Sequence, residues 1–415
     1  MVGKIIHMIL SFVIGLITAR YLGPSNYGLI GYAGAYTTFF TAICTLGINA
    51  IIVKNFIDYP DEEGEALGTT IVLRVIASVL SISVITGIVC VVDRGDTLAI
   101  VVVMLYSVSL VFQSFDIFRQ WFQSRLLSKY YAIATLISYV AMSLYKIYLL
   151  ATGKSVVWFA LSNTVDCIVV ALVLYLFFKK CKGPKLSFSW QKGKHLLKIS
   201  KSYILVGLMT AIYAFTDKFM LKQMVGEDAV GYYALAFSVS SMWTFILSAI
   251  IESASPSVMQ YHNEDKRKYL ISNKRLYAIV FYFSVVMSVF IFIIAPLFVR
   301  LVYGEAYLPS VNILRVAVWY VAFSYLGVAR DVWIVCEKKQ KYLKFIYIGS
   351  AALNVVLNAA LIPFFGAVGA AFASLMTQIS TIFVFPVILK DLRPNVKLMG
   401  EAILLRGVLP KRGGK

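Results

Sequence analysis

The chain has 415 residues, of which 60% are hydrophobic and 14% are charged, with a mean hydropathy of +0.81 and a formal net charge of +19. So few charged residues cannot cover the surface of a soluble protein of this length, which excludes an ordinary soluble domain and indicates a protein embedded in lipid. The positive charge does not indicate nucleic-acid binding, because it is confined to alternate loops between apolar segments.

Twelve apolar segments are each long enough to cross a membrane, for which an α-helix needs about 20 residues. A backbone in hydrocarbon must satisfy its own hydrogen bonds, so these segments are predicted to be helices in an all-α, polytopic membrane protein. In chain order they are residues 5–21, 29–53, 67–92, 97–118, 130–151, 155–178, 203–225, 229–255, 276–299, 311–336, 342–365 and 367–389. We therefore predict twelve transmembrane helices.

The distribution of Lys and Arg predicts the orientation of these helices. Basic residues concentrate at the N-terminus, in every second loop, as at 179–180, 266–268 and 338–339, and in the C-terminal tail. The positive-inside rule makes these segments cytoplasmic, with both termini inside. The protein is thus expected to be a multi-pass protein of the cytoplasmic (inner) membrane, and anionic lipid headgroups are sufficient partners for its basic loops.

A short turn near the start of the chain recurs in its second half. Residues 22–28 contain Gly23 and Gly28, residues 225–231 contain Gly226 and Gly231, and the two glycine pairs are separated by the same interval. A long apolar segment follows each copy. Internal repeats placed in this way are typical of transporters, so these four glycines are interpreted as structural turns of two like halves.

The longest polar stretch in the middle of the chain separates six spans from six, and its Pro and Gly residues favour a segment outside the membrane. The predicted organisation is therefore an N-terminal six-helix lobe over residues 1–178 and a basic cytoplasmic linker over 179–201. A C-terminal six-helix lobe follows over 202–389, with a basic cytoplasmic tail over 390–415.

Polar side chains recur along the fourth predicted span. An ionised side chain at the bilayer centre costs about 2.5–3.5 kcal/mol on insertion scales, so polar groups there need an explanation. Spacings of four and three place the members of this stripe on one side of a helix: they are Ser109, Gln113, Asp116, Gln120 and Gln123. The stripe is interpreted as lining a water-filled cavity between the lobes; the alternative is hydrogen bonding between packed helices.

Other charged residues occur within predicted spans. Arg20 and Arg74 lie near span ends and could reach the membrane surface by snorkelling, whereas Lys146 and Asp166 lie deeper. Acidic groups in a membrane cavity are typical proton or sodium sites. On this basis the candidates for ion coupling are Asp166, Asp217 and Glu252. The alternative for Asp217 is an ion pair with Lys146 or Lys218.

The tenth span carries two arginines that share a broad helix face, Arg315 and Arg330. Arginine can bind phosphate oxygens in a bidentate manner, so both are candidates for contact with an anionic substrate. The alternative for Arg330 is a position near the inner interface, paired with Asp331.

Motifs of soluble enzymes are missing from the sequence, including nucleophile elbows, Walker motifs, dinucleotide-binding loops, zinc spacings and kinase signatures. The five cysteines are too scattered to predict a disulfide or a metal site. We expect a transporter without a cofactor, not an enzyme. It would draw on an ion gradient, the membrane potential, or the supply and removal of substrate.

Residues 19–28, Ala-Arg-Tyr-Leu-Gly-Pro-Ser-Asn-Tyr-Gly, resemble the opening signature of the polysaccharide repeat-unit (O-antigen type, Wzx-like) flippases of the multidrug/oligosaccharidyl-lipid/polysaccharide (MOP) superfamily. Residues 217–221, Asp-Lys-Phe-Met-Leu, and 230–234, Val-Gly-Tyr-Tyr-Ala, followed by Pro256, resemble the second-half signature of the same family. The resemblance covers residues 5–389. Arg20, Gly23, Gly28, Asp217, Lys218 and Gly231 match by motif.

This resemblance implies a V-shaped, two-lobed, MATE-like transporter that opens a central charged cavity to alternate sides of the membrane. The substrate would be a polyprenyl-diphosphate-linked oligosaccharide, with H⁺ or Na⁺ as the coupling ion. A polysaccharide polymerase and a chain-length regulator would be partners, and nucleic acid would not. The candidate substrate-binding residues are Arg20, Arg74, Gln113, Asp116, Gln120, Lys146, Lys218, Arg315 and Arg330.

Two other classes of function stay open. A multidrug or cation antiporter or a lipid-II-type flippase would share the architecture, although the basic residues in the predicted cavity argue against a carrier of cations. A membrane-embedded glycosyltransferase or polymerase would need catalytic motifs in a sizeable outward loop, and the predicted outward loops are short.

Overall fold

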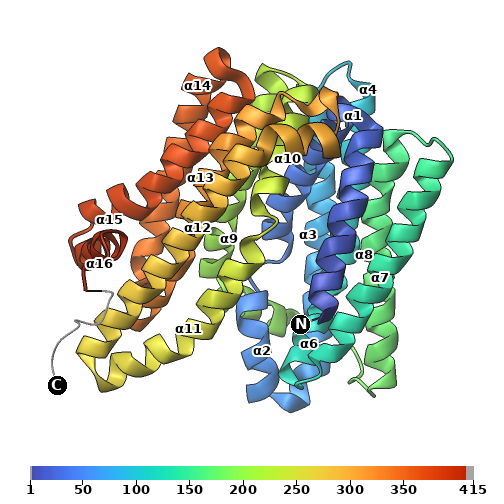
Figure 1. The fold of residues 1–415 in the computed structure, drawn as a ribbon. Helices are drawn as coiled ribbons and strands as arrows, with labels where there is room; N and C mark the ends of the chain where they lie inside the picture. The colour runs from blue at the N-terminus through green and yellow to red at the C-terminus, as the bar shows by residue number, and fades with distance from the viewer. Residues whose placement is uncertain (1, 408–415) are drawn as a thin grey trace. The chain divides into compact units, whose positions relative to one another are not determined.

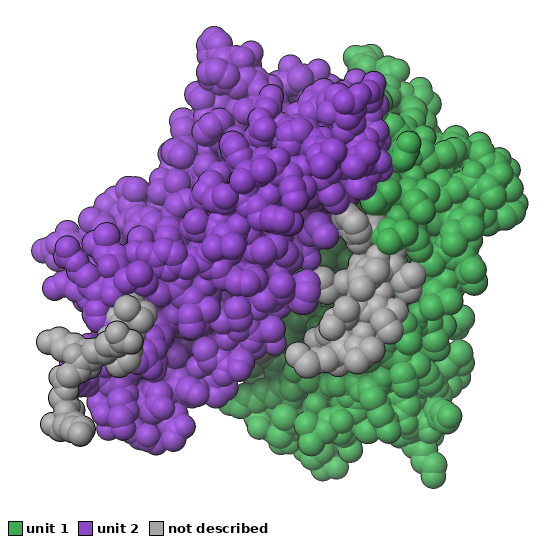
Figure 2. All heavy atoms as spheres, viewed as in Figure 1, with its two compact units in different colours: residues 1–219 green, residues 220–415 purple. Residues whose placement is uncertain are grey.

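The computed structural model describes the backbone of residues 2–407, and the side chains in this range except those of residues 2–12, 50, 202, 205, 206, 209, 210, 213 and 214. The described residues form helices joined by short turns, with no β-strand among them (Figure 1). The chain divides into two compact units, Met1–Phe219 and Met220–Lys415 (Figure 2). The prediction of an all-α fold is therefore confirmed.

Unit 1 is a bundle in which α1 packs against α3, α4 and α7, while α8 packs against α4 and α7. Its helices are α1 (Val2–Cys44), α2 (Asn49–Asp58), α3 (Glu63–Val92), α4 (Thr97–Ser107), α5 (Ser109–Gln113), α6 (Ile117–Ser124), α7 (Ser128–Ala151), α8 (Val156–Lys180) and most of α9 (Trp190–Met224), with 3₁₀ turns at Pro60–Glu62 and Ser114–Asp116. Aromatic side chains of α6 and α8, among them Phe118, Trp121 and Phe178, pack together at one end of the bundle.

Unit 2 is arranged around α13, which packs against α10, α11, α12 and α14. Its helices are α10 (Glu227–Ser241), α11 (Thr244–Glu264), α12 (Lys266–Val302), α13 (Ser310–Cys336), α14 (Leu343–Ile379), α15 (Phe385–Ile388) and α16 (Arg393–Ile403), with 3₁₀ turns at Glu305–Tyr307, Gln340–Tyr342 and Lys390–Leu392 and a π-helical turn at Ser380–Val384. Asp265 caps α12: its Oδ1 accepts hydrogen bonds from the backbone N–H groups of Arg267 (2.8 Å) and Lys268 (3.1 Å).

Seven helices in the described residues are long and apolar enough to cross a membrane, or eight if α10 and α11, which meet at a bend of 43°, form one span. The count depends on breaks inside long helices. Gly366 (φ 55°) interrupts α14 between the predicted spans 342–365 and 367–389, and Gly23 interrupts α1 in a similar way. The structure confirms several apolar helices, and the total of twelve spans stays a prediction.

The repeated turn of the sequence has the same kind of backbone in both copies. Gly23 and Gly226 have φ values of 72° and 125°, in the region that favours glycine because a Cβ would be strained there. Gly28 and Gly231 are different: both are buried inside the helices that follow. The prediction that all four glycines form turns was therefore wrong for these two, since a helical backbone at these positions needs no left-handed residue.

The segment between α8 and α9 is hydrogen-bonded to α3. The backbone N–H of Ser187 donates to Gly64 O (3.2 Å), and that of Ser189 donates to Thr69 Oγ1 (2.9 Å). A Cβ added at Gly68 would lie 2.3 Å from Ser187 O, so only glycine permits this approach. This part of the predicted linker therefore packs on unit 1 along one edge of α3.

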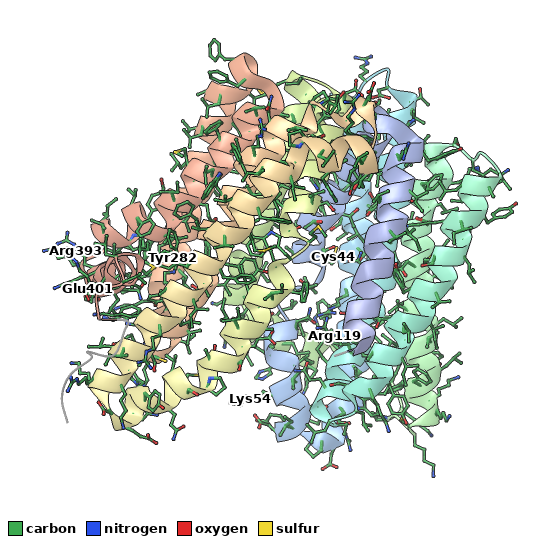
Figure 3. All side chains as sticks on the ribbon, viewed as in Figure 1. Cys44, Lys54, Arg119, Tyr282, Arg393 and Glu401 are labelled. Carbon is green, nitrogen blue, oxygen red and sulfur yellow. The ribbon has the colours of Figure 1, made fainter. Side chains whose placement is uncertain are left out.

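The C-terminal helix α16 packs on α12 within unit 2. Tyr282 Oη donates to Ile403 O (2.6 Å), and Lys274 Nζ lies 2.5 Å from Glu401 Oε2, where its hydrogen bond holds the pKa of Glu401 below its usual value. Arg393 and Glu401 are both on α16, with Tyr282 of α12 beside them (Figure 3). The start of the predicted tail is thus an ordered helix.

Candidate functional site

Two cavities within unit 1 are lined by several of its polar and charged residues. The first, which we call the Arg74 cavity, has a volume of about 280 Å³ and receives side chains from α1, α2, α3, α5, α7, α8 and two turns between helices. It is lined by Thr41, Thr45, Asn49, Arg74, Phe112, Gln113, Asp116, Tyr131, Asp166, Cys167, Val170 and Ala171. A charged guanidinium here is surrounded by hydroxyl, amide and carboxyl groups, as a site for polar ligands requires.

Arg74 is held at the wall of this cavity by α2 and the turn before it. Its side chain is 1% exposed, its Nη2 donates to Asn49 Oδ1 (2.7 Å) and to Thr45 O (3.3 Å), and Asp116 supplies a nearby negative charge. Snorkelling to the membrane surface, which its place near a span end had suggested, does not occur, because these partners keep the guanidinium inside the bundle.

The polar stripe of the fourth predicted span is divided by the structure, because that span is broken into α4, α5 and α6. Only Gln113 and Asp116 reach the Arg74 cavity, Gln113 with its Oε1 accepting from Thr41 Oγ1 (2.9 Å). Ser109 and Gln120 are buried beside them, and Gln123 is exposed. The stripe was predicted to line a cavity between the lobes, whereas the cavity that Gln113 and Asp116 line lies within unit 1.

Arg119, labelled in Figure 3, is the neighbour of this stripe that sequence reasoning omitted. It is exposed on α6, its Cζ lies 4.7 Å from the ring centroid of Tyr131, and its charge acts on Asp116 together with that of Arg74. The carboxylate of Asp116 is therefore flanked by two guanidinium groups.

The second cavity, which we call the Lys146 cavity, is larger, at about 420 Å³. It is lined by Ile14, Gly15, Thr18, Tyr27, Ile30, Tyr106, Tyr139, Met142, Ser143, Lys146, Phe159, Ser162, Asn163 and Asp166. Asp166 lines both cavities, and its Oδ1 accepts a hydrogen bond from Ser138 Oγ (2.5 Å). The predicted residues Lys146 and Asp166 are thus brought to one cavity, close enough for their opposite charges to interact.

The remaining candidates, apart from the two arginines of α13, lie elsewhere. Arg20 is exposed and lines neither of these two cavities. Asp217 is buried on α9, with Lys218 partly buried next to it and close enough for electrostatic interaction. Glu252, on α11 of unit 2, is exposed.

The two arginines of α13 differ in their surroundings. Arg330 is 3% exposed, its Nη1 donates to Thr381 O (2.9 Å), and its Nη2 donates to Asp331 Oδ1 (3.1 Å). Arg315 lies over the ring of Phe292, with Cζ 4.9 Å from the centroid. The pairing of Arg330 with Asp331, one of the two interpretations from the sequence, is the arrangement present in the structure.

Sequence reasoning missed a second group of buried polar side chains, on α14 of unit 2. Asn358 Nδ2 donates to Asn354 Oδ1 (3.1 Å), and Ser374 Oγ lies 3.3 Å from Tyr233 Oη. All four residues are buried. Their spacing of four along an apolar helix is the signal that could have found Asn354 and Asn358, because it is the same signal that marks the stripe.

The chemistry available at these sites is binding. Among the residues that the structure describes, no group of three or more His, Cys, Asp and Glu side chains could hold a metal ion. The cavities of unit 1 offer opposite charges, hydroxyls and aromatic rings at fixed positions, which suit recognition of a polar ligand.

A family model described as polysaccharide biosynthesis protein matches residues 17–312, more than half of the chain. The comparison with curated proteins found no match to this chain. Among solved structures, the lipid II flippase MurJ in an inward closed conformation has a TM-score of 0.77 at 15% identity, over 98% of this chain and 91% of that chain.

Two further solved structures share the fold. A multidrug resistance MATE family transporter of the MOP superfamily, in an inward-facing conformation, has a TM-score of 0.69 at 15% identity, over 95% of this chain and 96% of that one. A MOP superfamily transporter from Pyrococcus furiosus has a TM-score of 0.60 at 15% identity, over 96% and 94%. The fold is therefore the one that these transporters and the lipid II flippase have. The chain belongs to the polysaccharide biosynthesis protein family and is a multi-pass membrane protein with the fold of MOP-superfamily transporters and flippases.

Proposed function

We propose that the protein is a Wzx-like flippase that moves polyprenyl-diphosphate-linked oligosaccharide repeat units, of the O-antigen type, across the cytoplasmic membrane. The observation that carries this proposal is the match of residues 17–312 to polysaccharide biosynthesis proteins, in a chain whose fold is also that of a lipid II flippase. A lipid-linked glycan joins these two facts, because it is a substrate of polysaccharide synthesis that must cross a membrane.

The residues of unit 1 support a carrier of a polar headgroup. Arg74 and Lys146 place positive charge inside the bundle, and Arg can hold phosphate oxygens in a bidentate manner. In this proposal the diphosphate and sugars occupy charged sites while the lipid tail stays in the bilayer. The six-helix lobes would open in turn to the two sides, with both termini cytoplasmic. A polymerase and a chain-length regulator would act on the product.

Coupling to an ion is part of the same proposal. Asp166 lines both cavities of unit 1, and Asp217 is buried on α9, and these positions support the two residues as sites for H⁺ or Na⁺. Glu252 is exposed and has less support. If the proposal is correct, Asp217→Asn and Asp166→Asn should each reduce transport driven by an ion gradient while leaving membrane insertion unchanged.

The test is transport by the purified full-length protein in liposomes. A fluorescent polyprenyl-diphosphate disaccharide placed in one leaflet should appear in the other, with no new glycosidic bond formed. Empty liposomes give the background rate. Absence of transfer above this background by correctly folded protein would contradict the proposal.

A second candidate, a multidrug or cation antiporter, has one observation in its favour: the cavities of unit 1 hold two carboxyl groups, Asp116 and Asp166. Arg74 and Lys146 offset them. The same liposomes should therefore not accumulate cationic dyes, and accumulation without glycan transfer would favour the antiporter. A lipid-II-type flippase would instead transfer only the peptide-bearing disaccharide lipid.

A further inference from the structure

The Lys146 cavity contains polar groups that the protein itself does not satisfy. Thr18 Oγ1, Ser143 Oγ and Asn163 Nδ2 are buried and have no hydrogen-bond partner among the described residues. They belong to α1, α7 and α8, and all three residues line this cavity. A buried polar group without a partner is destabilising, so three of them around one space point to a bound molecule that supplies hydrogen bonds.

The volume of the cavity favours a bound small molecule over isolated water molecules. At about 420 Å³ it lies within the range of about 300–1,000 Å³ that small-molecule sites occupy, whereas one water needs only about 30 Å³. Each unpaired atom is covered by protein atoms in the structure, and a change of rotamer, which is common at binding sites, would turn it toward a ligand.

The lining indicates the chemical class of that ligand. Tyr27, Tyr106 and Phe159 provide aromatic surface, which suits the apolar face of a sugar ring. A sugar hydroxyl both donates and accepts, so it can satisfy the amide of Asn163 and the hydroxyls of Thr18 and Ser143 alike. An acyl chain would leave these atoms unpaired.

The charge of the cavity excludes other ligands. Lys146 and Asp166 lie close enough for their charges to interact, and both line the cavity. Because these charges are opposite, the cavity offers no net attraction to a cationic drug or to a diphosphate, and either ligand would meet one like charge at low dielectric. An uncharged, hydroxyl-rich molecule meets neither penalty.

We propose that the Lys146 cavity is a subsite for one uncharged pyranose ring of the transported glycan, held by Thr18, Ser143 and Asn163. This inference rests on the proposed function and deepens it: the sugar of the headgroup enters unit 1, and its diphosphate stays outside this cavity. Asn163 and Ser143 are then positions that favour sugar-bearing lipids over sugar-free ones.

Gly15 offers a way to fill the cavity. It lines the cavity, and no heavy atom of the described residues lies within 4 Å of a Cβ added there, so a side chain at this position meets open space. Gly15→Leu should therefore occupy the subsite without disturbing its walls. Asn163→Leu removes the amide. The matched control is Asn312→Leu, which changes an exposed asparagine on α13.

The experiment measures the dissociation constants of two probes for the full-length protein in phospholipid nanodiscs. The probes are undecaprenyl diphosphate carrying an uncharged disaccharide and undecaprenyl diphosphate alone, and the free disaccharide serves as a competitor. We expect the unaltered protein to bind the sugar-bearing lipid about tenfold more tightly, and Gly15→Leu and Asn163→Leu to remove that preference. Binding of the sugar-free lipid should stay unchanged in every variant.

Competition by millimolar free disaccharide in the unaltered protein, and its loss in Gly15→Leu, would support the subsite independently of the lipid. The subsite is refuted if both variants fold normally and retain the preference, or if the unaltered protein shows none. Transfer of both lipids in liposomes with no effect of Gly15→Leu would refute the subsite and leave the proposed function intact. Absence of binding and transfer of either lipid would refute the proposed function itself.

Discussion

Two buried arginines, Arg74 in unit 1 and Arg330 in unit 2, show how differently one side chain can be used inside a membrane protein. Arg330 is buried in unit 2 and donates to a carboxylate and to a carbonyl. Arg74 donates to an amide and a carbonyl at the wall of a cavity. Both arginines are buried, so burial alone does not mark a substrate contact. Arg74 is the candidate because open space lies next to its charge.

The largest expected effect comes from breaking the Arg330 pair. Arg330→Met removes the hydrogen bond to Thr381 O and leaves Asp331 without its partner. Because the Asp331 side chain is 39% exposed, the cost should be somewhat below the value of about 3–5 kcal/mol for a fully buried pair. We expect a lower thermal transition in detergent and less folded protein. The double variant Arg330→Met with Asp331→Asn should recover much of the loss. Normal stability of the single variant with loss of transport would instead make Arg330 a substrate contact.

Arg74→Met should reduce glycan transfer more than it reduces stability, the reverse of Arg330→Met. Its hydrogen bonds are to neutral groups, so the loss of stability is expected to be about 1–3 kcal/mol, while glycan transfer should fall at least about tenfold. Arg315→Ala tests a third arginine, which lies on an aromatic ring and should reduce transfer with little change in stability. Transfer rate and thermal transition measured on the same preparations separate the two effects. Full transfer by Arg74→Met would remove this cavity from the mechanism.

The attachment to α3 of the segment between α8 and α9 can be tested with two glycines of α3. Gly68→Ala would place its Cβ 2.3 Å from Ser187 O and should cost about 1–3 kcal/mol and increase tryptic cleavage at Lys182 and Lys185. Gly87→Ala is the matched control, because no heavy atom lies within 4 Å of its Cβ, and it should be neutral or stabilising. Equal cleavage in the two variants would show that the segment is not held by this contact.

The smallest effect is the pH dependence contributed by the cap of α12. Hydrogen bonds from the backbone N–H groups of Lys268 and Arg267 lower the pKa of Asp265 below its usual value. A lowered pKa means that the cap contributes stability above the usual value of 3.8 and loses it as the pH falls through the pKa of the folded protein. Stability of Asp265→Ala should lack this component, and identical acid profiles would contradict the assignment.

The helices were predictable because apolar length and the need to satisfy the backbone leave few alternatives in lipid. Their breaks were less predictable: the fourth predicted span divides at Ser107 and Ser114, where neither Pro nor Gly marks a break. The charged residues Lys146 and Asp166 were found as isolated positions in two spans. Their meeting at one cavity depends on the packing of α7 against α8, which a single sequence does not encode in any local pattern.

The polar side chains of unit 2 show the limit of reasoning from charge. Asn354 and Asn358 are uncharged, so a search for ionised residues in spans passes over them, although they are buried and hydrogen-bonded in α14. The importance of Gly68 could not be predicted from the sequence either, because this glycine lets the carbonyl of Ser187, between α8 and α9, approach α3. Such roles depend on what lies opposite a residue in space.

The central claim is that this protein transfers a lipid-linked glycan without chemical change. The most direct measurement is the time course of lectin accessibility of a polyprenyl-diphosphate oligosaccharide in sealed proteoliposomes, with the unaltered protein and Arg74→Met side by side. We expect accessibility to rise with the unaltered protein, to stay near the protein-free level with Arg74→Met, and the recovered lipid to be chemically identical to the one supplied. New glycosidic bonds, or no rise with folded, unaltered protein, would contradict the account.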